Sequence, residues 1–451
     1  MKMIYNVKDK PKFGQLIVFA FQQLLAIMAA TIAVPMIVNG ATGSEMSTSA
    51  ALFGAGVGTL VYVLFTKAKS PVFLGSSFAF LGSMMSAFAG AATMSVGYLG
   101  LIIGAVFAGL VYVVLAIVVK LVGVKWINKI MPAVVIGPTV AIIGLSLAGN
   151  AVGDLQTSNV EGGSPYVALI CGLVTLAVTM LCSVYGKKMA RLIPFIIGIL
   201  AGYLVATCFY FIGKASGNAA LMVIDYSALV NNFSEISFTS FIALPDFTFL
   251  KAFGDFSGFN GAYIGTIAVG YIPVAFVVFA EHIADHKNLS SIIEHDLLED
   301  PGLSRTLLGD GVGSMVGAFF GGCPNTTYGE SVGCVAITKN ASVRTIICTA
   351  FEAMLIAFIA PFVAFLSTIP SCVMGGVCIA LYGFIAVSGL KMLQKVDLDD
   401  NRNLFTASVI LIAGVGGLAL NFGNVTITEV ACALILGILT NVMLGRKKSN
   451  K

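Results

Sequence analysis

The chain has 451 residues, of which 58% are hydrophobic and only 10% are charged, and its formal net charge is +4. The mean hydropathy of +0.98 lies far above that of soluble proteins, and it predicts a multi-pass protein embedded in the lipid bilayer. Basic residues do not form a patch with interleaved aromatic side chains, so the sequence gives no indication of nucleic-acid binding.

Long apolar runs begin near the N-terminus and recur almost to the C-terminus. The first run follows a lysine-rich start and is too long for the core of a signal peptide, so we expect it to be retained. Together the runs predict about 14 membrane-spanning segments in two sets. These are 15–36, 49–66, 72–90, 97–121, 126–149, 164–184 and 190–212, then 263–285, 303–322, 328–338, 344–368, 371–391, 403–422 and 427–445.

The charges of the connecting loops predict the orientation of these spans. Lysine and arginine follow the even-numbered spans, and both are absent from the odd-numbered loops 37–48, 91–96, 150–163 and 423–426. The positive-inside rule therefore predicts that both termini are cytoplasmic. Loop 213–262 is the one exception, and it is long enough for the rule to weaken. We expect its phenylalanine-rich part, 238–256, to lie at the outer membrane interface.

Ionisable side chains, which are rare in this chain, gather in the segment 280–339. It contains all three histidines and several carboxylates, among them Glu281, Asp285, Asp310 and Glu330. An ionisable side chain at membrane depth costs roughly 3 kcal/mol and is functional by default. Glu330 lies between two apolar pieces, which favours a site. Glu281 follows a long apolar run, so a site and the cytoplasmic end of a span are equally good interpretations.

Two of the predicted spans are interrupted at corresponding places in the two sets. Residues 72–80 follow Pro71 and residues 325–333 follow Pro324, and both stretches combine small and β-favouring residues. Interrupted segments at matching positions of two halves indicate a transporter binding site between inverted repeats. Irregular backbone at membrane depth is tolerated only where it faces protein or a water-filled cavity. The alternative is an ordinary loop at 324–330 between two short helices.

The remaining polar residues and the cysteines do not indicate a functional site clearly. Glu352, within the eleventh span, either faces a cavity or pairs with a neighbour, and we expect 294–300 to be a solvated cytoplasmic loop. The cysteines show no metal-ligand spacing and are interpreted as small core side chains. We expect the histidines to be surface or helix-end residues rather than metal ligands; they are His282, His286 and His295. No nucleophile–base pair or phosphate loop indicates an enzyme.

Five motifs give the chain a resemblance to a known family. They are Ala-Glu-His at 280–282, Asp-Leu-Leu-Glu-Asp-Pro-Gly-Leu at 296–303, Pro-Asn-Thr-Thr-Tyr-Gly-Glu at 324–330, Leu-Gly-Ser-Ser-Phe-Ala-Phe at 74–80 and Val-Met-Gly-Gly-Val at 373–377. With these motifs the chain resembles the nucleobase–cation symporter family, which includes bacterial uracil permeases and nucleobase–ascorbate transporters. The resemblance is strongest to the uracil permease branch.

This resemblance implies an all-α polytopic membrane fold of about 14 segments in two inverted repeats of about seven segments each. Segments 3 and 10 would each contain a short strand, and the two strands would pair near the membrane centre. A core domain, 15–121 with 263–368, would move against a gate domain, 122–262 with 369–446.

The resemblance also implies a substrate site. Uracil is a small neutral ring with two N–H donors and two carbonyl acceptors, so its site needs carboxylates and backbone N–H groups in a cavity that excludes water. Glu281 and Glu330 would hydrogen-bond the base. Backbone groups at Phe78 and Gly329 would meet its carbonyls and ring nitrogens, with Tyr328 adjacent.

Three positions depart from the family pattern. Gln23 stands where the first span often has histidine. Ser331 stands where asparagine usually follows the glutamate of segment 10. Asp285 stands where the best-known uracil permease has histidine. These departures do not change the class of transporter that the resemblance implies. They bear on how transport is coupled to protons.

Asp285 lies four residues after Glu281, so one continuous helix would place both carboxylates on the same face. Close carboxylates disfavour joint ionisation and can hold one proton as a pair. We therefore expect Glu281, Asp285 and Glu330 to couple transport to protons. The alternative is that Asp285 is a solvated residue at the end of a helix.

The sequence thus predicts a proton-coupled importer of uracil, working by alternating access in the inner membrane of a bacterium. We expect this transporter to need no cofactor or metal, because the proton gradient supplies its coupling ion. A homodimer is an open alternative to a monomer. A purine symporter for xanthine or urate is the second interpretation, although purine members tend to have glutamine at the position of Glu330. A non-coupled channel is the third.

Overall fold

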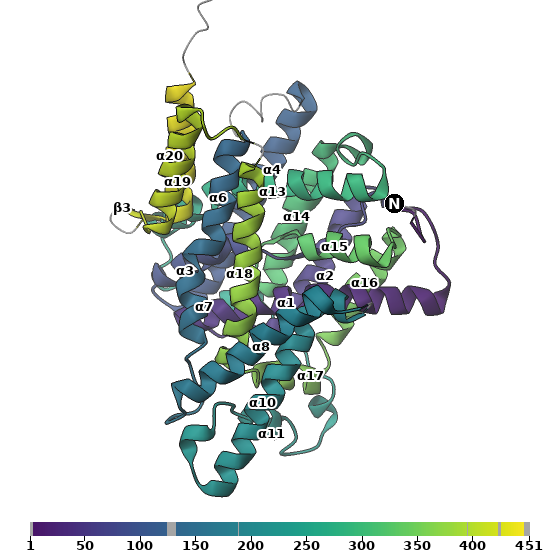
Figure 1. Ribbon diagram of the computed structural model, residues 1–451, viewed down its shortest axis with the longest axis vertical. Coiled ribbons are helices and arrows are strands. Elements are labelled where there is room, and N and C mark those ends of the chain that lie inside the picture. The colour runs from purple at the N-terminus through teal and green to yellow at the C-terminus, as the bar shows by residue number, and fades with distance from the viewer. Residues whose placement is uncertain (1–2, 124–131, 188, 395, 423–424, 446–451) are drawn as a thin grey trace, which may run out of the picture.

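The computed structural model describes residues 3–123, 132–187, 189–394, 396–422 and 425–445, and the chain is largely helical (Figure 1). The start of the predicted span 126–149 lies outside these residues. Among the described residues, eight helical stretches are long and apolar enough to cross a membrane. They are α1 (Phe13–Thr42), α2 (Thr48–Phe65), α4 (Met94–Val122), α6 with α7 (Ala133–Ser146 and Ala148–Asp154), α8 (Pro165–Tyr185), α10 (Pro194–Ser216), α13 (Gly261–Ile293) and α18 (Ser371–Leu393).

The other elements are shorter or more polar. The helices are α3 (Leu81–Ala89), α9 (Met189–Leu192), α11 (Ser227–Asn232), α12 (Thr248–Ala252), α14 (Leu303–Gly321), α15 (Gly329–Thr338), α16 (Val343–Ile356), α17 (Ala360–Ser367), α19 (Asn401–Val415) and α20 (Glu429–Leu444). The strands are β1 (Leu74–Ser76), β2 (Asn325–Thr327), β3 (Leu420–Phe422) and β4 (Val425–Ile427). The count of about 14 spans and the domain boundaries at 121, 262 and 368 stay predictions.

The helices pack in two groups. Helix α14 packs against both α2 and α4, and α13 packs against α4. In the second group, α18 packs against α6 and α8, α10 against α8, and α19 against α20 and α6. Glycine lets α2 and α14 approach closely, because a Cβ atom on Gly54 would lie 2.4 Å from the backbone oxygen of Gly317. Small residues at such a contact are typical of helix pairs in membranes, where backbones meet directly.

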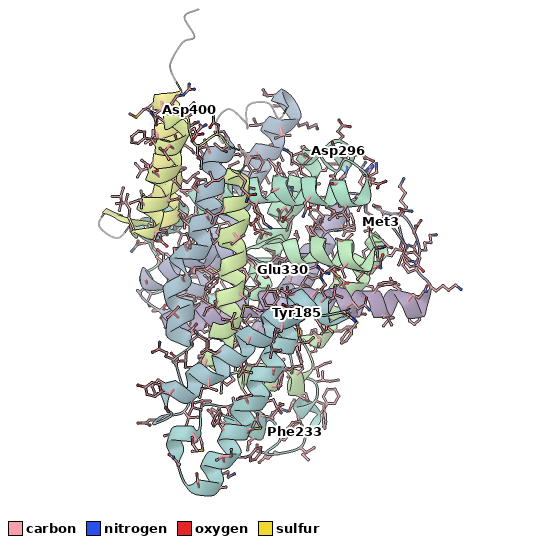
Figure 2. The ribbon with its side chains drawn as sticks, in the orientation of Figure 1. Met3, Tyr185, Phe233, Asp296, Glu330 and Asp400 are labelled. Atoms are coloured by element: carbon pink, nitrogen blue, oxygen red, sulfur yellow. The ribbon has the colours of Figure 1, made fainter. Side chains whose placement is uncertain are left out.

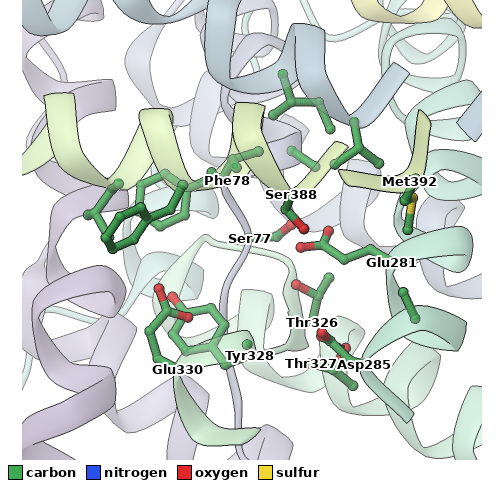
Figure 3. A pocket seen from close by; sticks show the side chains of 18 of the residues that line it. Ser77, Phe78, Glu281, Asp285, Thr326, Thr327, Tyr328, Glu330, Ser388 and Met392 are labelled. Carbon is green, nitrogen blue, oxygen red and sulfur yellow. Dashed lines mark hydrogen bonds between the residues drawn. The ribbon is translucent and has the colours of Figure 1, made fainter. Parts of the chain in front are cut away.

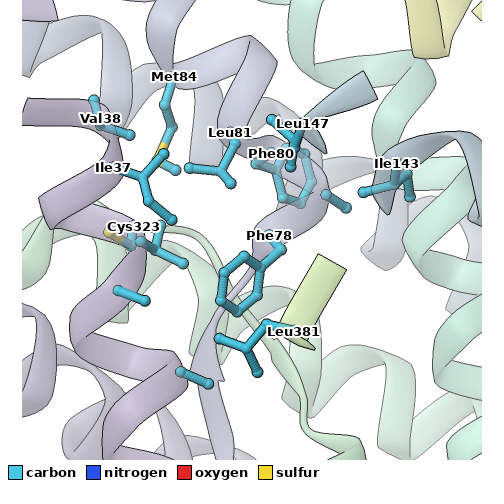
Figure 4. Close-up of a cluster of buried hydrophobic side chains, with 14 of the residues drawn as sticks. Ile37, Val38, Phe78, Phe80, Leu81, Met84, Ile143, Leu147, Cys323 and Leu381 are labelled. Atoms are coloured by element: carbon cyan, nitrogen blue, oxygen red, sulfur yellow. The ribbon is translucent and has the colours of Figure 1, made fainter. Parts of the chain in front are cut away.

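A buried apolar cluster joins these groups around Phe78 (Figure 4). Ile37 and Val38 of α1 and Met84 of α3 lie on one side of it, and Ile143 of α6 and Leu381 of α18 lie on the other. Six of the nine cysteines are also buried, which confirms their interpretation as core side chains for those six. Phe78 therefore lies where segments from both halves of the chain meet.

Several predicted spans differ from the structure, and three of them show how. The span predicted to end at residue 285 continues as α13 to Ile293. The span 344–368 is two helices, α16 and α17, and the break between them pairs with loop 213–262 through an antiparallel bridge from Ile242 to Ile359. The span 403–422 ends as a helix at Val415, and the chain then forms the β3–β4 hairpin. Hydropathy did not reveal these ends, because the polar or non-helical residues there are held by tertiary contacts.

Loop 213–262 is folded onto the helices. Phe249 stacks on Phe319 of α14 with ring centroids 4.8 Å apart, and Phe247 contacts Phe320 edge-on. Phe238 is 73% exposed and Phe253 is 55% exposed. Part of the phenylalanine-rich stretch therefore packs on the helices, and the placement of its exposed part at the outer interface stays a prediction.

Candidate substrate-binding site

The two interrupted segments meet as a two-stranded antiparallel sheet. Leu74 of β1 pairs with Thr327 of β2, Gly75 with Thr326, and Ser76 with Asn325. The backbone N–H of Ser77 extends the ladder by donating to the carbonyl of Pro324 at 2.9 Å. The predicted pairing of two short strands is therefore confirmed, and the alternative of an ordinary loop at 324–330 is wrong.

Each strand leads directly into a helix. A 3₁₀ turn, Phe78–Phe80, begins after β1 and continues as α3, and α15 begins at Gly329 after β2. The first N–H groups of a helix have no partner within the helix and carry a partial positive charge. The two helix starts therefore offer backbone donors beside the paired strands. A helix start with free N–H groups is a favourable place for an acceptor atom of a ligand.

A cavity of ≈ 340 Å³ lies at these helix starts (Figure 3). This is within the usual size range of small-molecule sites. The strand ends, α13 and α15 form one wall, and α6, α10 and α18 form the other. All six residues that the sequence predicts for the site line this cavity: Phe78, Glu281, Asp285, Tyr328, Gly329 and Glu330.

The carboxylates enter the cavity from different elements, with Glu281 and Asp285 on α13 and Glu330 on the first turn of α15. In the view of Figure 2, Glu330 lies near the centre of the molecule, whereas Asp296 and Asp400 lie near its edge. Within the described part of the chain, the structure records no side-chain partner for Glu281 or Glu330. These two carboxylates are half-buried and free to accept hydrogen bonds from a ligand.

Asp285 has a partner in the sheet, because the hydroxyl of Thr327 donates to its Oδ2 at 2.9 Å. Since α13 runs on to Ile293, Glu281 and Asp285 lie on one face of a continuous helix, as expected. The alternative that Asp285 is a residue at the end of a helix is therefore wrong. Whether Glu281 also marks the cytoplasmic end of a span stays open, because the helix continues beyond it in either case. The carboxylate pair is thus linked to β2 by one hydrogen bond.

Tyr328 closes the sheet on one side. Its hydroxyl donates to the carbonyl of Ser76 at 2.7 Å, and its ring covers Gly75 so closely that a Cβ atom there would lie 2.4 Å from the ring. Glycine at 75 is therefore required by this packing. Tyr328, the residue directly before α15, thus holds the last residue of β1 beside the start of that helix.

Two of the departures from the family pattern are in contact with each other. The side-chain amide of Gln23 donates to Ser331 Oγ at 2.7 Å, across 308 residues of sequence. The backbone N–H of Phe73 donates to the same oxygen at 3.1 Å. Both polar side chains are buried. Ser331 follows Glu330, so this pair fastens α1 and the residue before β1 to the first turn of α15.

The expected surface position of the histidines is wrong for His282 and His286, which are both 0% exposed. They lie on α13 away from the cavity, with ring centroids 4.0 Å apart. His286 Nδ1 faces the backbone carbonyl of His282 at 2.8 Å, and its Nε2 meets Tyr62 Oη at 2.6 Å. His295 is 45% exposed near the end of α13, as predicted.

Asp310 of α14 is the partner of His282, with Oδ2 at 2.6 Å from Nδ1. The Nε2 atom lies 3.0 Å from the hydroxyl of Thr306, which itself donates to the carbonyl of Leu303. With its hydroxyl hydrogen directed to Leu303, Thr306 accepts from Nε2–H, and in that tautomer one proton lies between His282 and Asp310. Sequence reasoning missed this pair; the signal was the aspartate within the glycine-rich run 309–313, since only a partner makes it tolerable there.

Glu352 does not line the cavity. It lies half-buried on α16 with Oε1 at 3.8 Å from the sulfur of Cys348, one turn earlier. Of its two predicted roles, pairing with a neighbour is confirmed and facing the cavity is wrong.

The amino-acid sequence is similar to those of known membrane permeases. A family model described as the permease family matches residues 14–422. The chain is 38% identical to a uracil permease of Bacillus caldolyticus, over 99% of this chain and 96% of the relative. It is 36% identical to a uracil permease of Bacillus subtilis, over 100% and 97%. It is 34% identical to a uracil permease of Escherichia coli K12, over 96% and 92%.

Solved structures of other transporters share the fold at low identity. The transmembrane domain of the cyanobacterial bicarbonate transporter BicA matches with a TM-score of 0.62 at 14% identity, over 98% of this chain and 100% of that one. The murine anion transporter Slc26a9 in its inward-facing state matches with a TM-score of 0.65 at 12% identity, over 97% and 69%. The family model and the permease relatives, together with the long apolar helices, define a multi-pass membrane transporter rather than an enzyme. More particularly, the chain belongs to the permease family that its residues 14–422 match.

The buried pair makes a prediction about stability. His282→Ala leaves Asp310 buried without its partner, and breaking such a pair costs about 3–5 kcal/mol. We expect His282→Ala and Asp310→Ala each to lower the thermal midpoint of the purified protein, and the double variant to lose less than the sum of the two. The control is His295→Ala, whose exposed side chain should matter little. Additive losses, or a stable His282→Ala, would show that the two side chains do not act as a pair.

Proposed function

We propose that this permease imports uracil together with protons, by alternating access across the inner membrane of a bacterium. One observation above all supports the proposal: two carboxylates with no side-chain partner among the described residues and two helix starts converge on one cavity beside the paired strands. The relatives named as uracil permeases, which align over almost the whole chain, support the choice of substrate.

The cavity matches the hydrogen-bonding groups of uracil. The two N–H groups of the ring need acceptors, and Glu281 and Glu330 provide them. The two ring carbonyls need donors, which are the backbone N–H groups at the helix starts, Phe78 and Gly329. Charge-assisted hydrogen bonds of this kind are stronger than neutral ones. Glu281 and Glu330 would therefore fix the orientation of the base.

Aromatic and aliphatic side chains supply the flat walls that a planar base needs. Phe78 and Tyr328 come from the strand side, and Phe195 and Phe384 from the opposite side. Because this opposite side is formed by α6, α10 and α18, substrate would lie between the proposed core domain and the proposed gate domain. Movement of one group of helices against the other would expose the cavity to alternate sides of the membrane.

Asp285 supplies a route for coupling to protons. Its carboxylate shares a helix face with Glu281 and accepts a hydrogen bond from Thr327, which lies in β2 directly before Tyr328. Gain or loss of a proton on the Glu281–Asp285 pair would thus alter both a substrate contact and the anchoring of the sheet. In this proposal, the pair holds one proton while substrate is carried inward and releases it to the cytoplasm.

Substrate binding tests the assignment of Glu330. Glu330→Gln should weaken uracil binding by roughly 10- to 150-fold, because a hydrogen bond to a charged group contributes about 1.5–3 kcal/mol. Calorimetry on the purified, folded variant measures this, with Glu352→Gln as the control outside the cavity. Wild-type affinity in Glu330→Gln would refute the assignment.

Competition of radiolabelled uracil with thymine, xanthine and adenine tests which base is bound. Stronger displacement by xanthine would favour the purine alternative.

Accumulation tests the role of Asp285. In proteoliposomes with an imposed proton gradient, Asp285→Asn should fail to accumulate uracil, because the pair no longer exchanges its proton. It should still bind uracil and exchange it down a concentration gradient. Asp296→Asn, at an exposed loop position, serves as the matched control. If Asp285→Asn accumulates uracil like the wild type, Asp285 has no part in coupling and Glu281 alone becomes the candidate.

The Gln23–Ser331 pair makes a third prediction. Ser331→Ala leaves the buried Gln23 amide and the Phe73 N–H without their acceptor, at a cost of about 1–3 kcal/mol. Because Glu330 precedes Ser331, we expect weaker uracil binding as well as lower stability. The double change Gln23→His with Ser331→Asn, which restores the usual family residues, should bind uracil better than either single change. Binding losses that simply add in the double variant would show that the two residues act independently.

A further inference from the structure

A second pocket, of ≈ 700 Å³, is separate from the substrate cavity and shares no lining residue with it. Three segments distant in sequence form it: the residues before α1, the turn that follows α2, and the first turns of α16. The pocket has a cationic rim of Lys8, Lys67, Lys69 and Arg344. These segments belong to the side of the protein that loop charges predict to be cytoplasmic.

The chain before α1 is fastened in place, so Lys8 is held at the rim. The N–H of Ala341 donates to the carbonyl of Tyr5 at 2.8 Å, and the N–H of Val343 donates to the carbonyl of Val7 at 3.1 Å. The hydroxyl of Ser342 donates to the carbonyl of Asp9 at 2.7 Å. This ladder sets Lys8 beside the start of α16.

The turn after α2 is also fixed. Lys67 and Ala68 both have left-handed backbone conformations, with φ of 53° and 54°, which residues other than glycine rarely adopt. Backbone hydrogen bonds from Ala68 to Val63 and from Lys69 to Thr66 hold the turn. Surrounding structure thus maintains a conformation that brings both lysines to the same pocket.

This positive charge is only partly compensated by Asp300. Lys69 pairs with Asp300, and the hydrogen bond from Lys69 is the main reason that the pKa of Asp300 lies below its usual value. Within the described part of the chain, no ion pair is recorded for the exposed side chains of Lys8, Lys67 and Arg344. Lys8 is close enough to Asp300 to help lower its pKa, whereas Lys67 and Arg344 face the opening with no carboxylate partner among the described residues.

The wall below this rim is apolar. Leu16 of α1 and Ile347 and Phe351 of α16 line it. Phe351 is 51% exposed, and on neighbouring turns of α1 and α2, Ile17 is 39% and Phe65 is 37% exposed. A free inorganic anion would meet the cations but gain nothing from this wall. A ligand with an anionic head and a hydrocarbon chain fits both parts.

We propose that this pocket binds an anionic phospholipid of the cytoplasmic leaflet. Its phosphate group lies among Lys8, Lys67 and Arg344, and an acyl chain lies along Leu16, Ile347 and Phe351. The inference rests on the proposed membrane orientation but not on the choice of substrate. Each basic residue near an anionic surface contributes about a factor of 5, so three give a preference of about 100-fold for phosphatidylglycerol over phosphatidylcholine.

Native mass spectrometry of the intact purified protein tests this, with phosphatidylglycerol, phosphatidylcholine and inorganic phosphate added separately. The triple variant Lys8→Gln, Lys67→Gln, Arg344→Gln should lose most of the preference for phosphatidylglycerol. A matched triple variant, Lys120→Gln, Lys187→Gln, Lys391→Gln, makes the same change in charge at exposed lysines elsewhere and should keep it. Both variants should bind uracil like the parent protein, which separates this test from that of the transport proposal.

A second variant tests the apolar wall without changing charge. Phe351→Gln should weaken retention of phosphatidylglycerol and leave any binding of inorganic phosphate unchanged. Equal loss of lipid in both triple variants would mean a general attraction between charges and would overturn the site. Full retention of phosphatidylglycerol by the first triple variant would overturn it too. Competition by millimolar phosphate alone would identify a site for soluble anions instead.

Discussion

The structure depends on the pairing of two strands of three residues each, β1 and β2, in the middle of a largely helical membrane protein. Inside a bilayer, every backbone N–H and C=O group needs a partner within the protein. The strands satisfy one another, so the helices that follow can begin inside the protein. That constraint places the starts of the Phe78 turn and of α15 side by side. Without the pairing, neither helix start would face the cavity.

The rest of the core serves to hold this small sheet. Glycine contacts between α2 and α14 leave space for Asn325 of β2, whose side chain donates to the carbonyl of Gly54 at 3.1 Å. Tyr328 covers Gly75, and Ser331 joins the residue before β1 to α1 through Gln23. Helix α13 has two polar faces. One presents carboxylates to the cavity, and the other fixes α13 to α2 and α14 through its histidines.

The sequence predicted the local features that carry the site. Pro71 and Pro324, each followed by small and β-favouring residues, indicated the interrupted segments, and isolated carboxylates such as Glu330 indicated a cavity. What failed were statements that depend on distant partners. The burial of His282 requires Asp310 from another helix, and the continuation of α13 past residue 285 requires neighbours that cover its polar turns. Hydropathy describes one segment at a time and contains no information on such contacts. The contact between Gln23 and Ser331, across 308 residues, was equally invisible.

A structure of the protein with uracil bound tests the central claim most directly. The account predicts the ring in the cavity beside the two strands, with its N–H groups at hydrogen-bond distance from the carboxylates of Glu281 and Glu330. Its carbonyls should face the backbone N–H groups at Phe78 and Gly329. Uracil bound elsewhere, or bound in this cavity without contact to either glutamate, would contradict the account.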